Sequence, residues 1–221
     1  VVYMELPRLA EASRYGITRT VGPLIQLLPS SVSGTSEPLS THARSVYSPS
    51  TIVNDSPLFF DASVTGSQPW EPKNYDGKFD GPMSLRSALA KSKNMVSIRI
   101  LQAVGAKNVQ QWVTHFGFEA ERHPPYLTMA LGAGSVTPMQ MAVGYSVFAN
   151  GGFRVNPYLI TKVTDNTGKV LHQFMPIEQE DAQRAIEPRN AFMMSQLLQE
   201  VTRSGTAARA QATLQRPDLY G

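Results

Sequence analysis

Two apolar stripes separated by a short polar turn constrain the fold of this chain most strongly. The first stripe follows Ser84, which can cap a helix that runs to about Lys91. The second repeats at helical spacing until Gly105, which is expected to end it. Each stripe needs a partner layer to cover it, so the sequence predicts packed helices around the turn Ser92-Lys93-Asn94. The residues of the two stripes are Leu85, Ala88, Leu89, Val96, Ile100 and Val104.

The turn carries a hydroxyl and an amide two positions apart. Ser92 can pass a proton, and Asn94 offers both a donor and an acceptor to a peptide-like substrate. A Ser-x-Asn tripeptide is common, and its plain interpretation is a helix–helix turn with Asn94 as a cap. The sequence on either side of the turn has to decide between the two interpretations.

Three further helices follow from caps and apolar periodicity. Asn108 is predicted to cap a helix that ends at Gly117. Thr137-Pro138 is a helix start, because threonine can cap and proline suits the first helical position. Pro188 opens a last helix, which Gly205 is expected to close. Their predicted inner faces are Val109, Trp112, Val113 and Phe116; Met141, Tyr145 and Phe148; and Phe192, Leu197, Leu198 and Val201.

Strands are fewer than helices. Residues 158–163 and 169–174 are predicted to pair as antiparallel strands around a turn at 165–168. Residues 51–82 are rich in Pro, Gly, Asn and Asp and are predicted to form a long ordered loop. The sequence therefore predicts an α+β fold in which helices pack on a small antiparallel sheet. The aromatic side chains expected to be buried in the loop are Trp70, Tyr75 and Phe79.

Composition narrows the chemistry. Apolar residues make up 42% of the 221 residues, which is enough for a core. The net charge is +3 without a run of Lys or Arg, so a nucleic-acid partner is not expected. The chain has no cysteine, which excludes disulfides, thiolate metal sites and a cysteine nucleophile. Its four histidines have no metal-binding spacing, so neither a metal nor a cofactor is expected.

The chain divides near residue 50. Residues 1–50 form an atypical segment, in which 19–28 could be one short apolar element and 29–50 are dominated by Pro, Ser and Thr. We expect partial disorder there. Residues 51–221 are expected to be one domain. Neither a signal peptide nor an apolar run of membrane-spanning length is present in the sequence.

Several longer blocks surround the Ser92 turn in a characteristic order. They resemble the transpeptidase domain of bifunctional class A penicillin-binding proteins over about residues 49–221. The implied fold is the penicillin-binding, β-lactamase-like serine transpeptidase fold in incomplete form. The blocks are Thr51–Pro57, Trp70–Phe79, Gly81–Ile100, Leu131–Ala142 with Phe148–Gly152, and Thr202–Arg209.

The resemblance implies a function and a site. In that family a serine attacks the carbonyl of a terminal D-Ala-D-Ala, and the acyl-enzyme then passes to an amine of a neighbouring stem peptide. By resemblance, Ser92 would be catalytic and relay a proton to the leaving amine, while Asn94 would bind the substrate amide. Gly205 and Thr206 would border the same cleft, although a helix end followed by a turn explains them equally well. Expected partners are peptidoglycan stem peptides and β-lactams.

Two family motifs are absent from these residues. No lysine has a serine three positions upstream, so there is no Ser-x-x-Lys, and there is no Lys-Thr-Gly. The resemblance places the nucleophile shortly before Thr51 and the Lys-Thr-Gly strand after Gly221. We therefore expect a truncated domain that is inactive by itself. In the intact protein a membrane anchor is expected upstream, with the domain at the periplasmic face of the inner membrane.

Other interpretations remain open. The chain could be a non-catalytic module of the same fold that binds cell-wall peptide or a partner protein, or a carboxypeptidase or β-lactamase relative. The Gly-rich segment 132–138 before a helix could bind phosphate, although close packing is the simpler explanation. Lys93 is expected to point away from the cleft, Lys91 to be exposed, and Asp76 and Asp80 to be turn residues.

Overall fold

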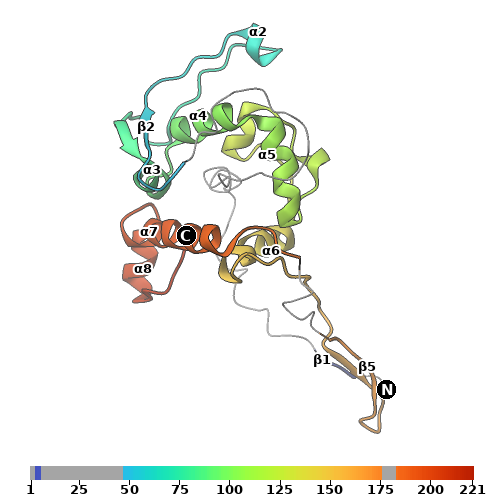
Figure 1. The fold of residues 1–221 in the computed structure, drawn as a ribbon. Coiled ribbons are helices and arrows are strands. Elements are labelled where there is room, and N and C mark those ends of the chain that lie inside the picture. The colour runs from blue at the N-terminus through green and yellow to red at the C-terminus, as the bar shows by residue number, and fades with distance from the viewer. Residues whose placement is uncertain (1–2, 6–46, 176–182) are drawn as a thin grey trace.

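The computed structural model describes residues 3–5, 47–175 and 183–221, which form helices and two small antiparallel sheets (Figure 1). This confirms the predicted α+β class. The predicted apolar element at 19–28 and the disorder expected for 29–46 lie outside the described residues. The strands are β1 (Tyr3–Glu5), β2 (Ile52–Asp55), β3 (Gly81–Ser84), β4 (Lys162–Thr164) and β5 (Val170–Gln173). The α-helices are α2 (Ala62–Thr65), α3 (Leu85–Ala90), α4 (Asn94–Val104), α5 (Ala106–Trp112), α6 (Pro138–Ala149), α7 (Pro188–Arg203) and α8 (Ala208–Leu214). The described residues also form the 3₁₀ helices η2 (Val113–Phe116), η3 (Ala120–Arg122) and η4 (Leu127–Leu131).

The helix pair α3–α4 forms as the sequence predicts. The Ser84 hydroxyl caps α3 by accepting a hydrogen bond from the Ser87 amide at 3.2 Å. Leu85 and Leu89 are buried on α3, and Val96 and Ile100 are buried on α4. The turn between the two helices is therefore fixed at both ends by packed elements.

A two-stranded sheet precedes α3, where the sequence analysis expected only a loop. Strands β2 and β3 pair antiparallel, with Ile52 opposite Ser84 and Asp55 opposite Gly81. The loop prediction for residues 51–82 was thus incomplete. Both strands are short and β3 contains a proline, so their pairing depends on contacts between distant residues and not on a local alternating pattern.

The aromatic residues of the loop between β2 and β3 behave differently from the prediction. Trp70 is half-buried and stacks on Phe60 with ring centroids 5.4 Å apart. Tyr75 is 85% exposed and Phe79 is 40% exposed, so their expected burial was wrong. Hydrogen bonds and ion pairs of polar side chains, described below, fix this part of the loop instead.

The third predicted helix begins earlier than expected. Gly105 precedes α5, and Asn108 lies inside the helix, where its side-chain nitrogen donates to the Val104 carbonyl at 2.8 Å. The last turn tightens into η2 and ends at Gly117, whose φ of +89° is left-handed. The predicted inner face is buried as a whole, and it consists of Val109, Trp112, Val113 and Phe116.

Helix α6 begins with the predicted cap. The Thr137 hydroxyl accepts from the Gln140 amide at 3.1 Å, and the Gln140 side chain accepts from the Thr137 amide at 2.9 Å. Pro138 occupies the first turn, where its missing N–H costs no hydrogen bond. Met141 and Phe148 are buried and Tyr145 is half-buried, in agreement with the predicted face.

The last long helix differs in its details. Pro188 opens α7 as predicted, and Leu197 and Leu198 are buried. Phe192 is 66% exposed, because the buried face runs through Ala191 and Met194 instead. Helix α7 ends at Arg203, before the expected stop at Gly205, and the short helix α8 follows it.

The predicted hairpin forms from shorter strands, β4 and β5, around the turn at Asp165–Gly168. Strand β1 pairs antiparallel with β4, which gives the strand order β1-β4-β5. This sheet forms an arm that extends away from the helices (Figure 1). None of the helices in the described ranges is long and apolar enough to cross a lipid bilayer.

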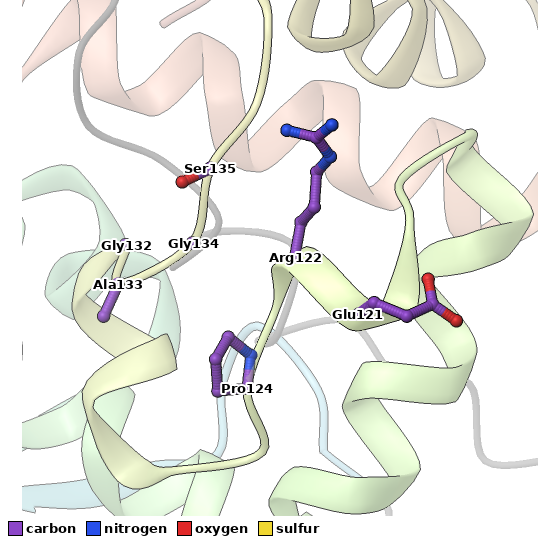
Figure 2. A pocket seen from close by; sticks show the side chains of 7 residues that line it. All are labelled: Glu121, Arg122, Pro124, Gly132, Ala133, Gly134 and Ser135. Carbon is purple, nitrogen blue, oxygen red and sulfur yellow. The ribbon is translucent and has the colours of Figure 1, made fainter.

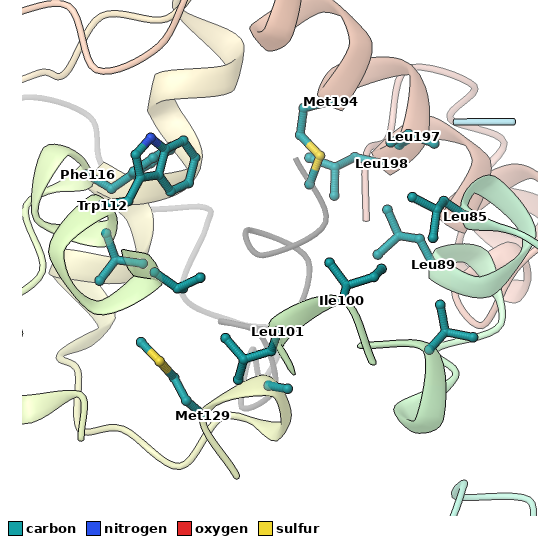
Figure 3. Packing of buried hydrophobic residues seen from close by; sticks show 14 of the residues in the cluster. Leu85, Leu89, Ile100, Leu101, Trp112, Phe116, Met129, Met194, Leu197 and Leu198 are labelled. Carbon is teal, nitrogen blue, oxygen red and sulfur yellow. The ribbon is translucent and has the colours of Figure 1, made fainter. Parts of the chain in front are cut away.

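The core joins the helices that carry the Ser92 turn to the C-terminal helices. Leu85 and Leu89 of α3 face Leu197 and Leu198 of α7 (Figure 3). The other part of the core lies around α4, η2 and η4, with Leu101, Phe116 and Met129 among its buried residues (Figure 3). Since α3 and α4 are each packed on a different neighbour, the turn between them has little freedom to shift.

Candidate active site

Helix α3 ends in a Schellman motif that determines where Ser92 lies. The Lys93 amide donates to the Ala88 carbonyl at 2.9 Å, and the Ser92 amide donates to the Leu89 carbonyl at 3.0 Å. Ser92 therefore takes the left-handed position that glycine usually occupies, with a φ of +54°. A side chain in this conformation strains the backbone, so the serine is present at a cost in stability.

Ser92 is exposed, and its hydroxyl makes no hydrogen bond within the part of the chain that the structure describes. Asn94 is the first residue of α4, with Lys93 before it, so it is not the cap of the plain interpretation. Its amide nitrogen donates to the Lys73 carbonyl at 2.7 Å, which leaves one N–H and the side-chain oxygen of this half-buried residue available. The turn thus presents a free hydroxyl beside a tethered amide.

Lys93 points into the protein. The sequence predicted only that it points away from the cleft, and not that it is buried among carboxylates. Its side chain is 2% exposed and its Nζ lies 3.3 Å from Asp55, 3.2 Å from Asp76 and 3.4 Å from Asp80. The carbonyl of Lys78 also accepts from it at 3.3 Å. Sequence reasoning missed this cluster, because the three carboxylates come from residues 13 to 38 positions upstream and a buried lysine has no local signature.

The contacts in this cluster shift the pKa values of Lys93, Asp76 and Asp80 in the direction that favours their charged forms. Burial alone would lower the pKa of Lys93, but the hydrogen bonds and charges of Asp76 and Asp55 outweigh it, so this pKa is raised above its usual 10.5. The Lys78 amide, followed by Lys93, lowers the pKa of Asp76 below 3.8. A hydrogen bond from Lys91 is the main cause that lowers the pKa of Asp80.

Lys91 is exposed as expected, yet it also binds Asp80, with an N–O distance of 2.9 Å. Asp76 does act as a turn residue, since it accepts from the Lys78 amide at 3.0 Å, and it binds Lys93 in addition. The loop between β2 and β3 is therefore held to the Ser92 turn by opposite charges.

Asn74 connects the loop directly to α4. Its side-chain oxygen accepts from the amides of Asn94 at 2.8 Å and Met95 at 3.4 Å. Its side-chain nitrogen donates to Asp55 at 2.8 Å and 3.0 Å and to the Lys78 carbonyl at 2.7 Å. The first amides of a helix have no acceptor within the helix, so Asn74 caps α4 from another segment.

Gly205 and Thr206 lie next to the end of α3. The Thr206 amide donates to the Ala90 carbonyl at 3.0 Å. A Cβ atom on Gly205 would lie 2.2 Å from the same oxygen, so only glycine permits this approach. This pair, from the segment after α7, thus contacts Ala90, which lies two residues before Ser92 in the sequence.

The Gly-rich segment is not arranged to bind phosphate. Its backbone amides are already used, since Ala133 donates to the Thr128 carbonyl at 3.3 Å, Gly134 to Gly132 at 2.8 Å and Ser135 to Arg122 at 3.2 Å. Close packing explains it, because a Cβ atom on Gly134 would lie 2.6 Å from a buried histidine ring, that of His123. The phosphate interpretation of residues 132–138 therefore has no support.

A shallow hollow does lie beside this segment (Figure 2). The charged ends of Glu121 and Arg122 point away from each other there, so they do not converge on a common ligand (Figure 2). A second hollow is lined by Pro49, Ser50, Ser84 and Arg86. Neither hollow is lined by Ser92 or Asn94. The Ser92 turn is therefore the candidate site because of its side-chain chemistry and not because of a hollow.

Among the described residues, no histidine takes part in the Ser92 turn. His115 lies in η2 and is exposed. His123 is 1% exposed, with Nδ1 donating to the Glu119 carbonyl at 2.8 Å and Nε2 without a hydrogen-bond partner. In the described ranges, no group of three or more His, Asp or Glu side chains is arranged to hold a metal ion.

Comparison with known proteins agrees with this geometry. Residues 46–220 match the model of the penicillin-binding protein transpeptidase domain. The chain belongs to this family. Penicillin-binding protein 1A of Neisseria flavescens is 47% identical over 173 residues, and that of Pseudomonas aeruginosa is 35% identical over 221 aligned positions. These matches cover 78% and 79% of this chain but only 22% and 27% of the relatives.

Solved structures support the same fold. The crystal structure of penicillin-binding protein 1A from Haemophilus influenzae matches with a TM-score of 0.72 at 32% identity, over 78% of this chain and 30% of that chain. Penicillin-binding protein A of Mycobacterium tuberculosis, in its penicillin G acyl-enzyme complex, matches with a TM-score of 0.61 over 71% of this chain and 39% of that chain. At 20% identity, the second match speaks for the fold alone. This member of the transpeptidase family thus spans less than a third of its curated relatives.

Proposed function

We propose that this chain is part of a peptidoglycan D,D-transpeptidase, an acyltransferase that cross-links stem peptides through a serine acyl-enzyme. The observation that carries the proposal is Ser92, a strained and exposed serine whose free hydroxyl lies beside the tethered amide of Asn94. Family membership supplies the reaction class, and the strain at a non-glycine residue is typical of a functional position.

The roles follow from the chemistry of the side chains. Ser92 relays a proton to the leaving amine, and Asn94 binds the substrate amide through its remaining N–H and its oxygen. Gly205 and Thr206 lie beside this turn, because their backbone contacts Ala90 at the end of α3. The substrates are stem peptides that end in D-Ala-D-Ala, and β-lactams acylate the same centre. No metal or cofactor is required for this acyl transfer.

These 221 residues do not form an acyl-enzyme by themselves. They contain neither the Ser-x-x-Lys that supplies nucleophile and base nor the Lys-Thr-Gly of the family. Ser92 cannot replace the nucleophile, since no lysine or histidine lies within hydrogen-bond distance of its hydroxyl in the described part of the chain. We place the intact protein at the periplasmic face of the inner membrane, where its substrates are.

Fluorescent penicillin tests the proposal in two steps. The purified 221-residue chain is expected to give no covalent band in a denaturing gel. Membranes of the source organism are then labelled, and each band is digested with trypsin. Peptides of this chain such as Asn94–Arg99 are expected in a labelled band. Their presence in unlabelled bands alone would contradict the transpeptidase assignment.

A second candidate is a non-catalytic module that binds cell-wall peptide. The missing Ser-x-x-Lys in an otherwise recognisable domain favours it. It predicts saturable binding of a D-Ala-D-Ala stem peptide to the protein found in unlabelled bands. A labelled band that contains the peptides of this chain would rule it out.

A further inference from the structure

The strain at Ser92 raises the question of what holds this residue in place. A left-handed serine at the end of α3 is locally unfavourable, so the segments on both sides must determine its conformation. The residue that follows it, Lys93, is the end of α3's Schellman motif and also precedes the first residue of α4. Any displacement of Lys93 therefore moves both Ser92 and Asn94.

Lys93 is held by charge. Its Nζ lies within 3.4 Å of the carboxylates of Asp55, Asp76 and Asp80, and its side chain is 2% exposed. Asp55 is fully buried, so the lysine and this carboxylate need each other. Removing one partner of a buried ion pair leaves an uncompensated buried charge, so Lys93 is held where its carboxylate partners lie.

Asn74 holds the other side of the turn. Its oxygen accepts from the amides of Asn94 and Met95, and its nitrogen donates to both oxygens of Asp55. Asp55 thus joins the two anchors, since it binds Lys93 directly and α4 through Asn74. All these partners are buried or half-buried, which keeps water from competing for the same hydrogen bonds.

We propose that Lys93 and Asn74 are positioning residues, which hold the Ser92 hydroxyl and the Asn94 amide in a fixed relationship through their shared partner Asp55. This inference deepens the proposed function and rests on it for the roles of Ser92 and Asn94. The conformation of the turn then depends on these two side chains, and this dependence can be measured without any reaction.

Nuclear magnetic resonance on the ¹⁵N-labelled 221-residue chain tests this directly. Asn74→Ala removes the acceptor of the Asn94 and Met95 amides, and their hydrogen exchange is expected to accelerate about tenfold or more. Lys93→Met removes the buried charge and is expected to shift the amide resonances of the same turn. Lys93→Arg should restore them in part. Lys91→Met is the matched control, because its side chain is exposed and it contacts only Asp80 among these carboxylates.

Peptide binding gives a second readout. The chain is titrated with a stem peptide ending in D-Ala-D-Ala, and the L-Ala-L-Ala isomer serves as the control. Lys93→Met and Asn74→Ala are expected to weaken binding about tenfold, while Lys93→Arg and Lys91→Met stay within about twofold of the unsubstituted chain. Melting temperatures measured on the same samples separate a loss of positioning from unfolding.

The outcomes distinguish the two proposals. Unchanged exchange at Asn94 and Met95 in Asn74→Ala, together with unchanged turn resonances in Lys93→Met, would overturn the positioning role. If those signals change as expected but the unsubstituted chain binds no D-peptide, the positioning role stands and the proposed substrate fails. Should Lys93→Met not fold, Asn74→Ala decides the matter, because it leaves Lys93 with its three carboxylates.

Discussion

The backbone amide of Thr206 donates a hydrogen bond of 3.0 Å to the carbonyl oxygen of Ala90, two residues before Ser92. This bond joins the segment after α7 to the end of α3. It is possible only because Gly205 lacks a side chain, since a Cβ atom there would lie 2.2 Å from the same oxygen. The position of the Ser92 turn therefore depends on a glycine more than a hundred residues away.

Replacing Gly205 by alanine is expected to destabilise the protein. The clash is with backbone atoms of Ala90, which cannot move aside as a flexible side chain could, and overpacking of this kind costs about 1–3 kcal/mol. Urea unfolding measures the loss. Thr206→Ala is the control, because the side chain is exposed and the backbone N–H remains, so a change within about 0.5 kcal/mol is expected. Equal stability of Gly205→Ala and the unsubstituted protein would contradict the close approach.

Glycine at position 92 should make the protein more stable than alanine does. Its left-handed conformation disfavours any side chain, so Ser92→Gly is expected to be more stable than Ser92→Ala by about 1 kcal/mol. Comparison of the two variants removes the contribution of the hydroxyl, which both lack. Thermal unfolding checks the order, and a more stable Ser92→Ala would mean that this residue is not left-handed.

The cap of α6 should contribute a measurable part of the stability. Thr137→Ala removes the acceptor of the Gln140 amide and is expected to cost about 1 kcal/mol. Gln140→Ala removes the return hydrogen bond and the exposed hydrogen bond that the Gln140 side chain donates to Glu119, and it should cost less. The measurement is urea unfolding of both variants at neutral pH. A larger loss of stability in Gln140→Ala than in Thr137→Ala would contradict the leading role of the threonine hydroxyl in this cap.

Stability should fall in acid because of the cluster around Lys93. The folded pKa values of Asp76 and Asp80 lie below 3.8, so these carboxylates stabilise the fold above that pH and lose the effect as pH falls through their folded values. The pH dependence due to Lys93 runs in the opposite direction. Its folded pKa is raised above 10.5, so its contribution to stability is present below 10.5 and is lost as pH rises through the folded pKa. Urea midpoints between about pH 3 and 11 are expected to decline at both ends.

A substitution of Asp76 tests whether this carboxylate causes part of the loss of stability in acid. Asp76→Asn removes one of the titrating carboxylates and should flatten the loss of stability below about pH 4, relative to the unsubstituted protein. The effect is expected to be small, because Asp76 is half exposed and water screens its charge. Parallel acid limbs for the two proteins would show that this carboxylate does not contribute.

Much of the helical structure could be read from the sequence, because its causes are local. Ser84 and Thr137 cap their helices with side chains a few residues from the amides that they bind. The apolar stripe around Trp112 buries as its spacing predicts. Phe192 shows the limit of prediction from apolar spacing. It is apolar and lies near the predicted stripe of α7, yet it is 66% exposed.

The sequence by itself determined where α3, α4, α6 and α7 begin, the caps Ser84 and Thr137, the α+β class and the family to which the blocks around Ser92 belong. The tertiary structure alone decided that Lys93 is buried among three aspartates and that Asn74 caps α4. The physical reason is distance along the chain. A helix cap joins residues about three positions apart, whereas Asp55 and Lys93 meet only after the β2–β3 pair has folded the intervening segment back.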